Sequence, residues 1–411
     1  MQSVPTDLPR ASGRWRLLTW LCLLLVTHGS LYPWQFAWPA AGLGAAWQAL
    51  WSPAPLWTGL GDVVGNVALF VPVGLLMLLD LGASRWPARA RTPLMLALGT
   101  LFALLLQIVQ IVVPDRDPLL SDVVWNALGL GLGAALMALW RRHPPAGTVP
   151  DAARALRLAL VAAWLAIEWW PLLPTIDWQH VKDALKPLLL QPGWRAGSFV
   201  EAALWVIAAD RLLAGTRRAG WWLLLLAVAV LAGKLFVAGQ VLTLSRVAGM
   251  GLGLLCAAAL RRAEGARSAL WLVAAMLLWI SMDELRPFEL ADAAGEFHAV
   301  PFVALLIGSM SANALSLLGM GAWMGVIFVL ASELGARLVP LAAALSLWLL
   351  LLEVAQMWLR GRVADITPAL LPWFWVALMH SMGLVPRRIS RRRRRSSGPG
   401  SDPSRRSRPT A

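Results

Sequence analysis

Residues Pro340–Pro368 read PLAAALSLWLLLLEVAQMWLRGRVADITP, an uncharged apolar run that ends in a dense group of polar side chains. Glu353 and Gln356 are three residues apart and therefore share one face of a helix. Arg362 and Asp365 follow Gln356 within ten residues. An apolar run long enough to cross a bilayer, ending in such a group, predicts a membrane span with a polar site at its mouth.

A glutamine followed six residues later by an arginine marks the end of three long apolar runs, in the pairs Gln110–Arg116, Gln240–Arg246 and Gln356–Arg362. Three of the nine glutamines in the chain have an arginine at this spacing, which is more than chance would give. The recurrence predicts an internal repeat of three units.

The composition is that of a membrane protein. The chain has 411 residues, of which 59% are hydrophobic and 14% are charged, whereas soluble proteins average about 25% charged residues. Because a helix needs ~20 apolar residues to cross a bilayer, the apolar runs predict an all-α, polytopic transmembrane helical bundle. We expect about twelve spans, near residues 17–31, 61–79, 93–113, 119–140, 157–173, 198–214, 221–241, 247–260, 268–285, 311–332, 339–358 and 366–385.

Twelve spans divide evenly into three units of four helices. The predicted organisation is a cytoplasmic leader (1–16), three repeats (17–142, 155–262 and 268–386, the second degenerate) and a disordered, arginine-rich cytoplasmic tail (387–411). In each repeat the connection between the first two spans is long (32–60, 174–197 and 286–310). These connections are expected to cover Arg116, Arg246 and Arg362 on the outer side of the membrane.

The distribution of charge predicts the orientation. Segments assigned to the cytoplasm hold 27 of the 36 basic residues and seven of the 22 acids, for a net charge of +20 against −6 elsewhere. This split follows the positive-inside rule and places both termini in the cytoplasm. The run Arg391–Arg395 permits a nucleic-acid hypothesis, but a tail that touches anionic lipid is the better interpretation, so no nucleic-acid partner is expected.

At these residues the chain resembles the VanZ-like family. The family's first helix pattern is matched by Asp62, Asn66, Phe70, Pro72 and Gly74, and its later segment by Gln107, Gln110, Arg116, Asp122, Asn126 and Gly129. The third repeat matches the front of the later segment with Glu353, Gln356, Arg362 and Asp365, whereas Pro368 and Pro372 replace the second aspartate and the asparagine. The likeness extends over about 61–136 and, more loosely, over 297–380.

The resemblance implies a location in the cell envelope but does not specify a chemical reaction. The family is associated with glycopeptide resistance, mainly to teicoplanin, and with cell-envelope or exopolysaccharide functions. It implies a multi-pass protein of the bacterial inner (cytoplasmic) membrane, with membrane lipids or a lipid-linked glycan as partners.

Arg116, Arg246 and Arg362 are the strongest candidates for ligand binding. A guanidinium group suits bidentate contact with phosphate or carboxylate, so the sequence predicts an anionic headgroup at the outer leaflet. The alternative is that these arginines pair with acids such as Asp117, Asp122 or Asp365 and fasten helix ends.

Two further groups of polar residues lie within predicted spans. Asp62 and Asn66 share one helical face, as do Asp122 and Asn126, so the two helices could share a hydrogen-bond network or supply a general acid and base. Lys234, six residues before Gln240, is expected to pair inside the membrane, with Glu168 or Glu201 the predicted partner.

Two classes of function follow from these residues. The first is a non-enzymatic envelope protein that binds, shields or moves an anionic lipid or lipid-linked glycan, and we favour it. The second is an intramembrane enzyme that acts on such a lipid. The five histidines lack ligand spacing and no phosphate-binding glycine loop is present, so neither a metal nor a cofactor is expected.

Overall fold

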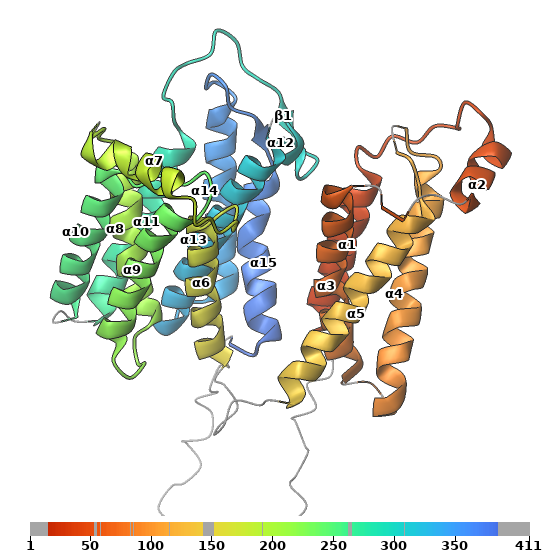
Figure 1. Cartoon of the computed structure of the whole chain (residues 1–411), viewed down its shortest axis with the longest axis horizontal. Coiled ribbons are helices and arrows are strands. Elements are labelled where there is room, and N and C mark those ends of the chain that lie inside the picture. The colour runs from red at the N-terminus through yellow and green to blue at the C-terminus, as the bar shows by residue number, and fades with distance from the viewer. Residues whose placement is uncertain are drawn as a thin grey trace, which may run out of the picture.

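The computed structural model describes residues 15–52, 56–57, 59–82, 84, 86–114, 116–142, 152–190, 192–261, 265–307 and 309–384. Most of this part is α-helix, and almost none of it is strand (Figure 1). Two short parallel strands, β1 (Phe297–His298) and β2 (Ala364–Asp365), pair with each other. The prediction of an all-α membrane protein is confirmed, whereas the predicted tail and nearly all of the predicted leader lie outside the described residues.

The first bundle, with its own hydrophobic core, consists of α1 (Arg16–Leu31), α3 (Leu60–Gly82), α4 (Ala88–Gln110) and α5 (Leu120–Arg142). The short helix α2 (Leu43–Trp51) contributes no residue to this core and lies to one side of the bundle in Figure 1. The core includes Val26, Phe70 and Leu130. Gly129 and Gly133 of α5 lie against the backbone of α3, so close that a Cβ atom at either position would overlap it. This close approach is the one that the glycine spacing predicts.

Most of the remaining helices share a second core. They are α6 (Ala152–Glu168), α8 (Ala196–Leu212), α9 (Ala219–Phe236), α10 (Leu244–Leu260), α11 (Gly265–Glu284), α13 (Met310–Glu333), α14 (Leu338–Gln356) and α15 (Thr367–Ser381). The shorter helices α7 (Trp178–Leu189) and α12 (Val303–Leu306) contribute no residue to it. Trp164, Trp205 and Trp323 stack at its centre. The glycine contact recurs here, since Gly249 and Gly253 of α10 lie against α8.

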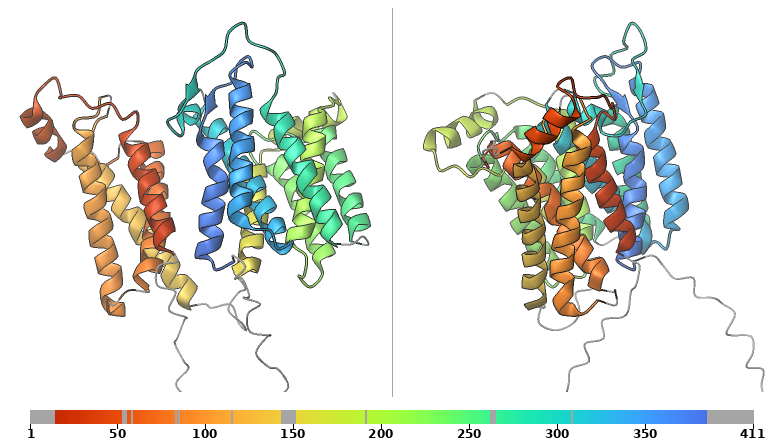
Figure 2. Two further views of the ribbon diagram at one scale, coloured as in Figure 1. Left: turned by 180° about the vertical axis from the view of Figure 1, so that it is seen from behind. Right: turned by 90° about the vertical axis from the view of Figure 1, so that its right-hand side faces the viewer.

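Few contacts join the two bundles. The views in Figure 2 place α1 beside α15, which it contacts. His28 Nε2 lies 2.8 Å from the backbone oxygen of Pro301, and the His28 ring also packs near Phe302. Trp34 Nε1–H donates to His28 Nδ1 at 2.9 Å, so the proton of the neutral ring lies on Nε2 and is donated to Pro301.

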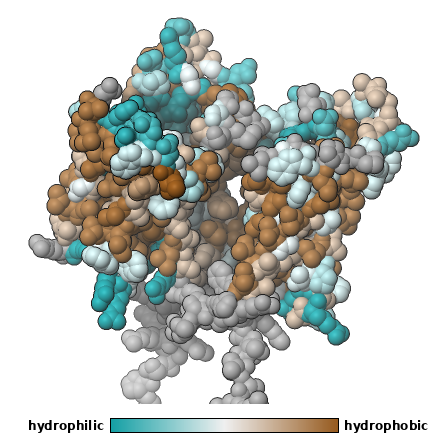
Figure 3. Space-filling model, in the orientation of Figure 1, coloured by the Kyte–Doolittle hydropathy of each residue, from teal (hydrophilic) through white to brown (hydrophobic). Residues whose placement is uncertain are grey.

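The surface in Figure 3 shows a broad apolar belt between more polar ends, as expected for a protein surrounded by lipid. Seven helices in the described residues are long and apolar enough to cross a membrane: α3, α4, α5, α9, α11, α13 and α14. Five others, of 15 to 17 residues, coincide with the remaining predicted spans: α1, α6, α8, α10 and α15. Twelve crossings therefore stay a prediction.

Candidate functional site

In the first bundle, the residues after α4 fold back onto the end of α1. Gln110 Nε2 donates to the backbone oxygen of Ser30 at 2.8 Å. Arg116 Nη2 donates to the backbone oxygens of Gly29 at 3.1 Å and Tyr32 at 3.4 Å. The helix end leaves these carbonyl groups without intrahelical partners, and the two side chains satisfy them.

The residues after α14 make the same contacts with the end of α11. Arg362 donates through Nε to the backbone oxygen of Arg286 at 2.7 Å and through Nη2 to that of Asp283 at 2.5 Å. Gln356 Nε2 donates to the Glu284 carboxylate at 2.7 Å. A proline follows each of the two helices, Pro33 after α1 and Pro287 after α11. When these prolines are aligned, Asp283, Glu284 and Arg286 correspond to Gly29, Ser30 and Tyr32.

In both bundles, a side chain near the end of a helix (α4 or α14) accepts a hydrogen bond from a backbone N–H twelve residues later. The Leu119 N–H donates to Gln107 Oε1 at 3.0 Å, and the Asp365 N–H donates to Glu353 Oε2 at 2.9 Å. Gln107 precedes Gln110 by three residues, just as Glu353 precedes Gln356. The side chains that the sequence aligns between the first and third units therefore make matching contacts.

The middle unit corrects the predicted alignment. Here Lys234 Nζ donates to the backbone oxygen of Glu168 at 2.7 Å, and Gln240 Nε2 donates to that of Trp170. Glu168 and Trp170 precede Pro171 as Ser30 and Tyr32 precede Pro33. Lys234 and Gln240 thus stand where the other units have glutamine and arginine. Gln240 and Arg246 therefore do not make the contacts of the pairs Gln110–Arg116 and Gln356–Arg362, and the three-unit repeat stays a prediction.

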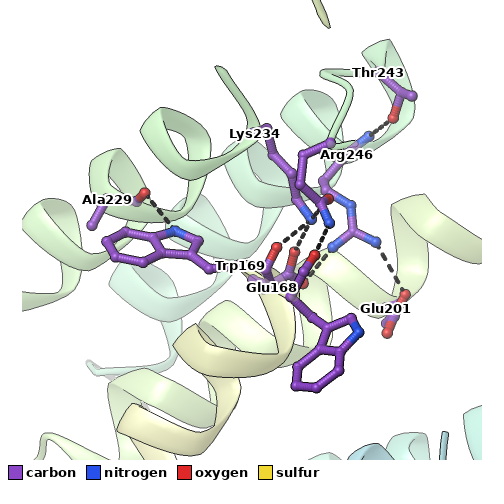
Figure 4. Close-up of polar contacts among 9 residues, drawn as sticks. Glu168, Trp169, Glu201, Ala229, Lys234, Thr243 and Arg246 are labelled. Atoms are coloured by element: carbon purple, nitrogen blue, oxygen red, sulfur yellow. Dashed lines mark hydrogen bonds and ion pairs between the residues drawn. The ribbon is translucent and has the colours of Figure 1, made fainter. Parts of the chain in front are cut away.

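Arg246 belongs to a buried ion cluster instead (Figure 4). Lys234 Nζ lies 2.9 Å from Glu168 Oε2, and Arg246 pairs with the same carboxylate. A second Arg246 nitrogen lies 3.5 Å from Glu201 Oε2. The intramembrane pairing predicted for Lys234 is confirmed, with Glu168 as the partner.

The first bundle holds a polar cavity of about 580 Å³ between α1, α3, α4 and α5, which we call the first cavity. Asp122 on its wall accepts from Asn66 Nδ2 at 3.0 Å and from Gln107 Nε2 at 3.4 Å. The network predicted between the Asp62–Asn66 and Asp122–Asn126 helices is therefore present in part. Asn126 is 4% exposed and lines the cavity, yet its Oδ1 has no hydrogen-bond partner.

The second bundle holds two adjoining cavities. The third cavity, of about 290 Å³, is lined by the third unit's polar residues, which are Glu284, Asn313, Glu353, Gln356, Arg362 and Asp365. The middle cavity, of about 390 Å³, lies against the buried ion cluster. Both linings include Glu284, Ser316 and Met320, so the two spaces meet there.

The charges do not favour the anionic headgroup that the sequence predicts. Each of the three cavities is lined by two more acidic than basic side chains. Arg116 and Arg362 donate mainly to backbone oxygens, so they fasten chain segments to helix ends. The predicted partners Asp117, Asp122 and Asp365 form no ion pair with these arginines; the nearest carboxylate to Arg362 is Glu284, at 4.0 Å.

Residues 18–141 match the family model described as VanZ/LLP1. This part of the chain is VanZ-like. The matched residues run from α1 to the end of α5 and contain the first cavity. A comparison with curated proteins found no match, and a comparison with solved structures also found none.

The VanZ-like region brings six predicted site residues to one cavity: Asp62, Asn66, Gln110, Arg116, Asp122 and Asn126. Of the remaining candidates, Glu353, Gln356, Arg362 and Asp365 line the third cavity, and Gln240 and Arg246 line the middle one. The sequence analysis missed Glu284, which lines both cavities of the second bundle. The sequence feature that could have indicated Glu284 is its position three residues before Pro287, which matches that of Glu168 before Pro171.

Proposed function

We propose that this integral membrane VanZ-like protein binds the hydroxyl-rich headgroup of a lipid-linked glycan in the first cavity, without altering it chemically. The observation that carries the proposal is Asn126, a residue that lines the cavity and whose buried amide oxygen has no hydrogen-bond partner. An unsatisfied buried polar atom costs about 1–3 kcal/mol, which a ligand hydroxyl would recover.

The other polar groups of the cavity support a sugar. Asp62 has no hydrogen-bond partner among the described residues and offers carboxylate oxygens to hydroxyl donors. Arg116 uses Nη2 for backbone contacts and leaves Nε and Nη1 available as donors. Acceptors and donors that face one space suit a hydroxyl-rich ligand, whereas the net negative lining opposes an anion. The volume lies within the range of about 300–1,000 Å³ for small-molecule sites.

The enzymatic alternative would use Asp62 and Asp122 as acid and base. Both Asp122 oxygens already accept hydrogen bonds, from Asn66 and Gln107, and this occupancy favours a fixed scaffold over a proton-transferring group. The headgroup-binding role is therefore the better supported of the two.

The experiment is a comparison of lipids that copurify with the intact protein, measured by mass spectrometry. Wild-type protein should retain a glycolipid or lipid-linked glycan, and Asn126→Leu should lose it. Val124→Ala is the matched control, because Val124 lies on the same helix but is exposed on the outer surface. Equal retention by wild type and Asn126→Leu would contradict the proposal. Chemical conversion of the retained lipid by wild type alone would favour the enzyme.

A further inference from the structure

The third cavity differs from the first in the kind of polar atom that it leaves free. Glu353 is 4% exposed and uses Oε2 to accept from the Asp365 N–H, so Oε1 has no partner among the described residues. Gln356 is 3% exposed and gives Nε2 to Glu284, which leaves its own Oε1 free. Glu284 likewise has one oxygen in use and one without a partner. The free atoms on this wall are acceptors.

The donors of the same cavity are largely in use. Asn313 Nδ2 donates to the backbone oxygens of Ala304 and Ile307. Arg362 gives Nε and Nη2 to backbone oxygens, and its Nη1 lies 4.0 Å from Glu284. The Ser316 hydroxyl and Arg362 Nη1 remain as donors, and they are fewer than the free acceptors, so a ligand rich in donors suits this space.

Three substitutions between the matching units explain the contrast. Glu353 stands where the first unit has Gln107, Asp365 where it has Leu119, and Glu284 where it has Ser30. Each change places a carboxylate at a new position. The third cavity has as many acids as the first, which is lined by Asp62, Asp117 and Asp122, so the two differ in where the carboxylates lie and not in net charge. In the third cavity the carboxylates of Glu353 and Glu284 lie among free acceptor atoms, and a bound cation would supply their counter-charge.

A primary ammonium group is the cation whose number of N–H donors matches the free acceptors of the third cavity. Within the described residues, no group of three or more histidine, cysteine or acidic side chains has the arrangement of a metal site. A primary ammonium group carries one positive charge and three N–H donors. Glu353 Oε1, Glu284 and Gln356 Oε1 supply three acceptors for it.

We propose that the third cavity binds a primary ammonium group, carried by a membrane lipid headgroup or by an amino sugar. Glu353 and Glu284 supply the counter-charge, and Gln356 completes the set of acceptors. The site lies outside the VanZ-like region, and it does not depend on what the first cavity binds.

The test is native mass spectrometry of the full chain titrated with lipids of identical acyl chains. Phosphatidylethanolamine carries a primary ammonium group, phosphatidylcholine keeps the charge without N–H donors, and phosphatidylglycerol offers only hydroxyl groups. Phosphatidylethanolamine should bind at least about tenfold more tightly than either of the others, as expected for hydrogen bonds to charged groups. Separate titrations with glucosamine and with glucose ask whether a soluble amine also binds.

Glu353→Gln should remove the preference for the amine. The fold should tolerate this change because Gln107 accepts the equivalent backbone N–H, from Leu119, at 3.0 Å. Glu296→Gln is the matched control and should leave the preference unchanged, because Glu296 is exposed and lines none of the three cavities. Binding of glucosamine over glucose identifies an amino sugar as a source, and binding of the lipid alone identifies a headgroup.

Two results would overturn the proposal. The first is a wild-type protein that prefers neither phosphatidylethanolamine nor glucosamine, a result that needs no variant. The second is a folded Glu353→Gln protein that keeps the full preference.

Discussion

Lys234 Nζ lies 2.9 Å from the carboxylate of Glu168, and both side chains are buried. Arg246 shares that carboxylate and also lies 3.5 Å from Glu201, so Glu168 is the anion that pairs with both cations. Glu168→Gln should therefore destabilise the protein more than Lys234→Met, which leaves Glu168 paired with Arg246. We expect the loss for Glu168→Gln to be about 3–5 kcal/mol, as for other broken buried ion pairs, measured by thermal unfolding in detergent. Equal effects of the two changes would show that Glu168 is not the centre of the cluster.

Small residues hold α3 against α5. A Cβ atom at Gly129 would overlap the backbone oxygen of Val67, whereas a Cβ atom at Gly131 would meet nothing within 4 Å. Gly129→Ala should lower the free energy of unfolding by about 1–3 kcal/mol because of overpacking, and Gly131→Ala should not lower it. Unfolding curves of the two variants test this. A Gly131→Ala protein as unstable as Gly129→Ala would contradict the packing role of Gly129, because alanine favours the helix more than glycine does.

Arg362 fastens the segment that follows α11. Its Nε and Nη2 hold the backbone oxygens of Arg286 and Asp283, two contacts that a single lysine ammonium would not reproduce in the same geometry. Arg362→Lys should raise amide hydrogen exchange across residues 286–300. Arg360→Lys is the control, because Arg360 is exposed and its side chain contacts only the exposed Asp292, at 3.4 Å. Unchanged exchange in Arg362→Lys would refute the fastening role.

Asn126 should lower the stability of the ligand-free protein while it contributes to ligand binding. Asn126→Leu removes a buried polar atom that lacks a partner, so the ligand-free protein should unfold at the same or a higher temperature than wild type. A large decrease would instead indicate that Asn126 has a structural partner, and differential scanning fluorimetry of delipidated protein distinguishes the two.

The orientation of the protein is open to a direct test. Figure 1 places α2 and α7 at the same end of the helices. Reporter fusions after Trp57, Lys186 and Asp292 should lie outside the cell, and fusions after Arg89, Arg218 and Arg262 inside, because the second set lies in basic stretches of the chain. Two or more reversals would contradict the three-repeat organisation.

The positions of the helices were predictable because their signal is local. A chain in lipid must satisfy its backbone hydrogen bonds within each helix, so long apolar runs mark helices directly. The ion pair between Lys234 and Glu168 was predictable for a similar reason, since an unpaired charge in the membrane is costly.

The register of the middle unit was not predictable from spacing. Gln240 and Arg246 repeat the spacing of the other units, but the contacts depend on which residue faces the end of α6, and there Lys234 takes the glutamine position. Fastening of helix ends was the alternative prediction for Arg116 and Arg362, but with acidic partners. Their actual partners are backbone oxygens, which leave no mark in a sequence.

The two hydrophobic cores differ in when they can be completed during synthesis. The first core uses residues between Val26 and Met137, so all of its side chains are available once α5 has left the ribosome. The second joins Leu156 of α6 to Met379 of α15 and stays open until the last helix is made. The N-terminal bundle can therefore assemble first and present α1 as a preformed surface on which α15 docks.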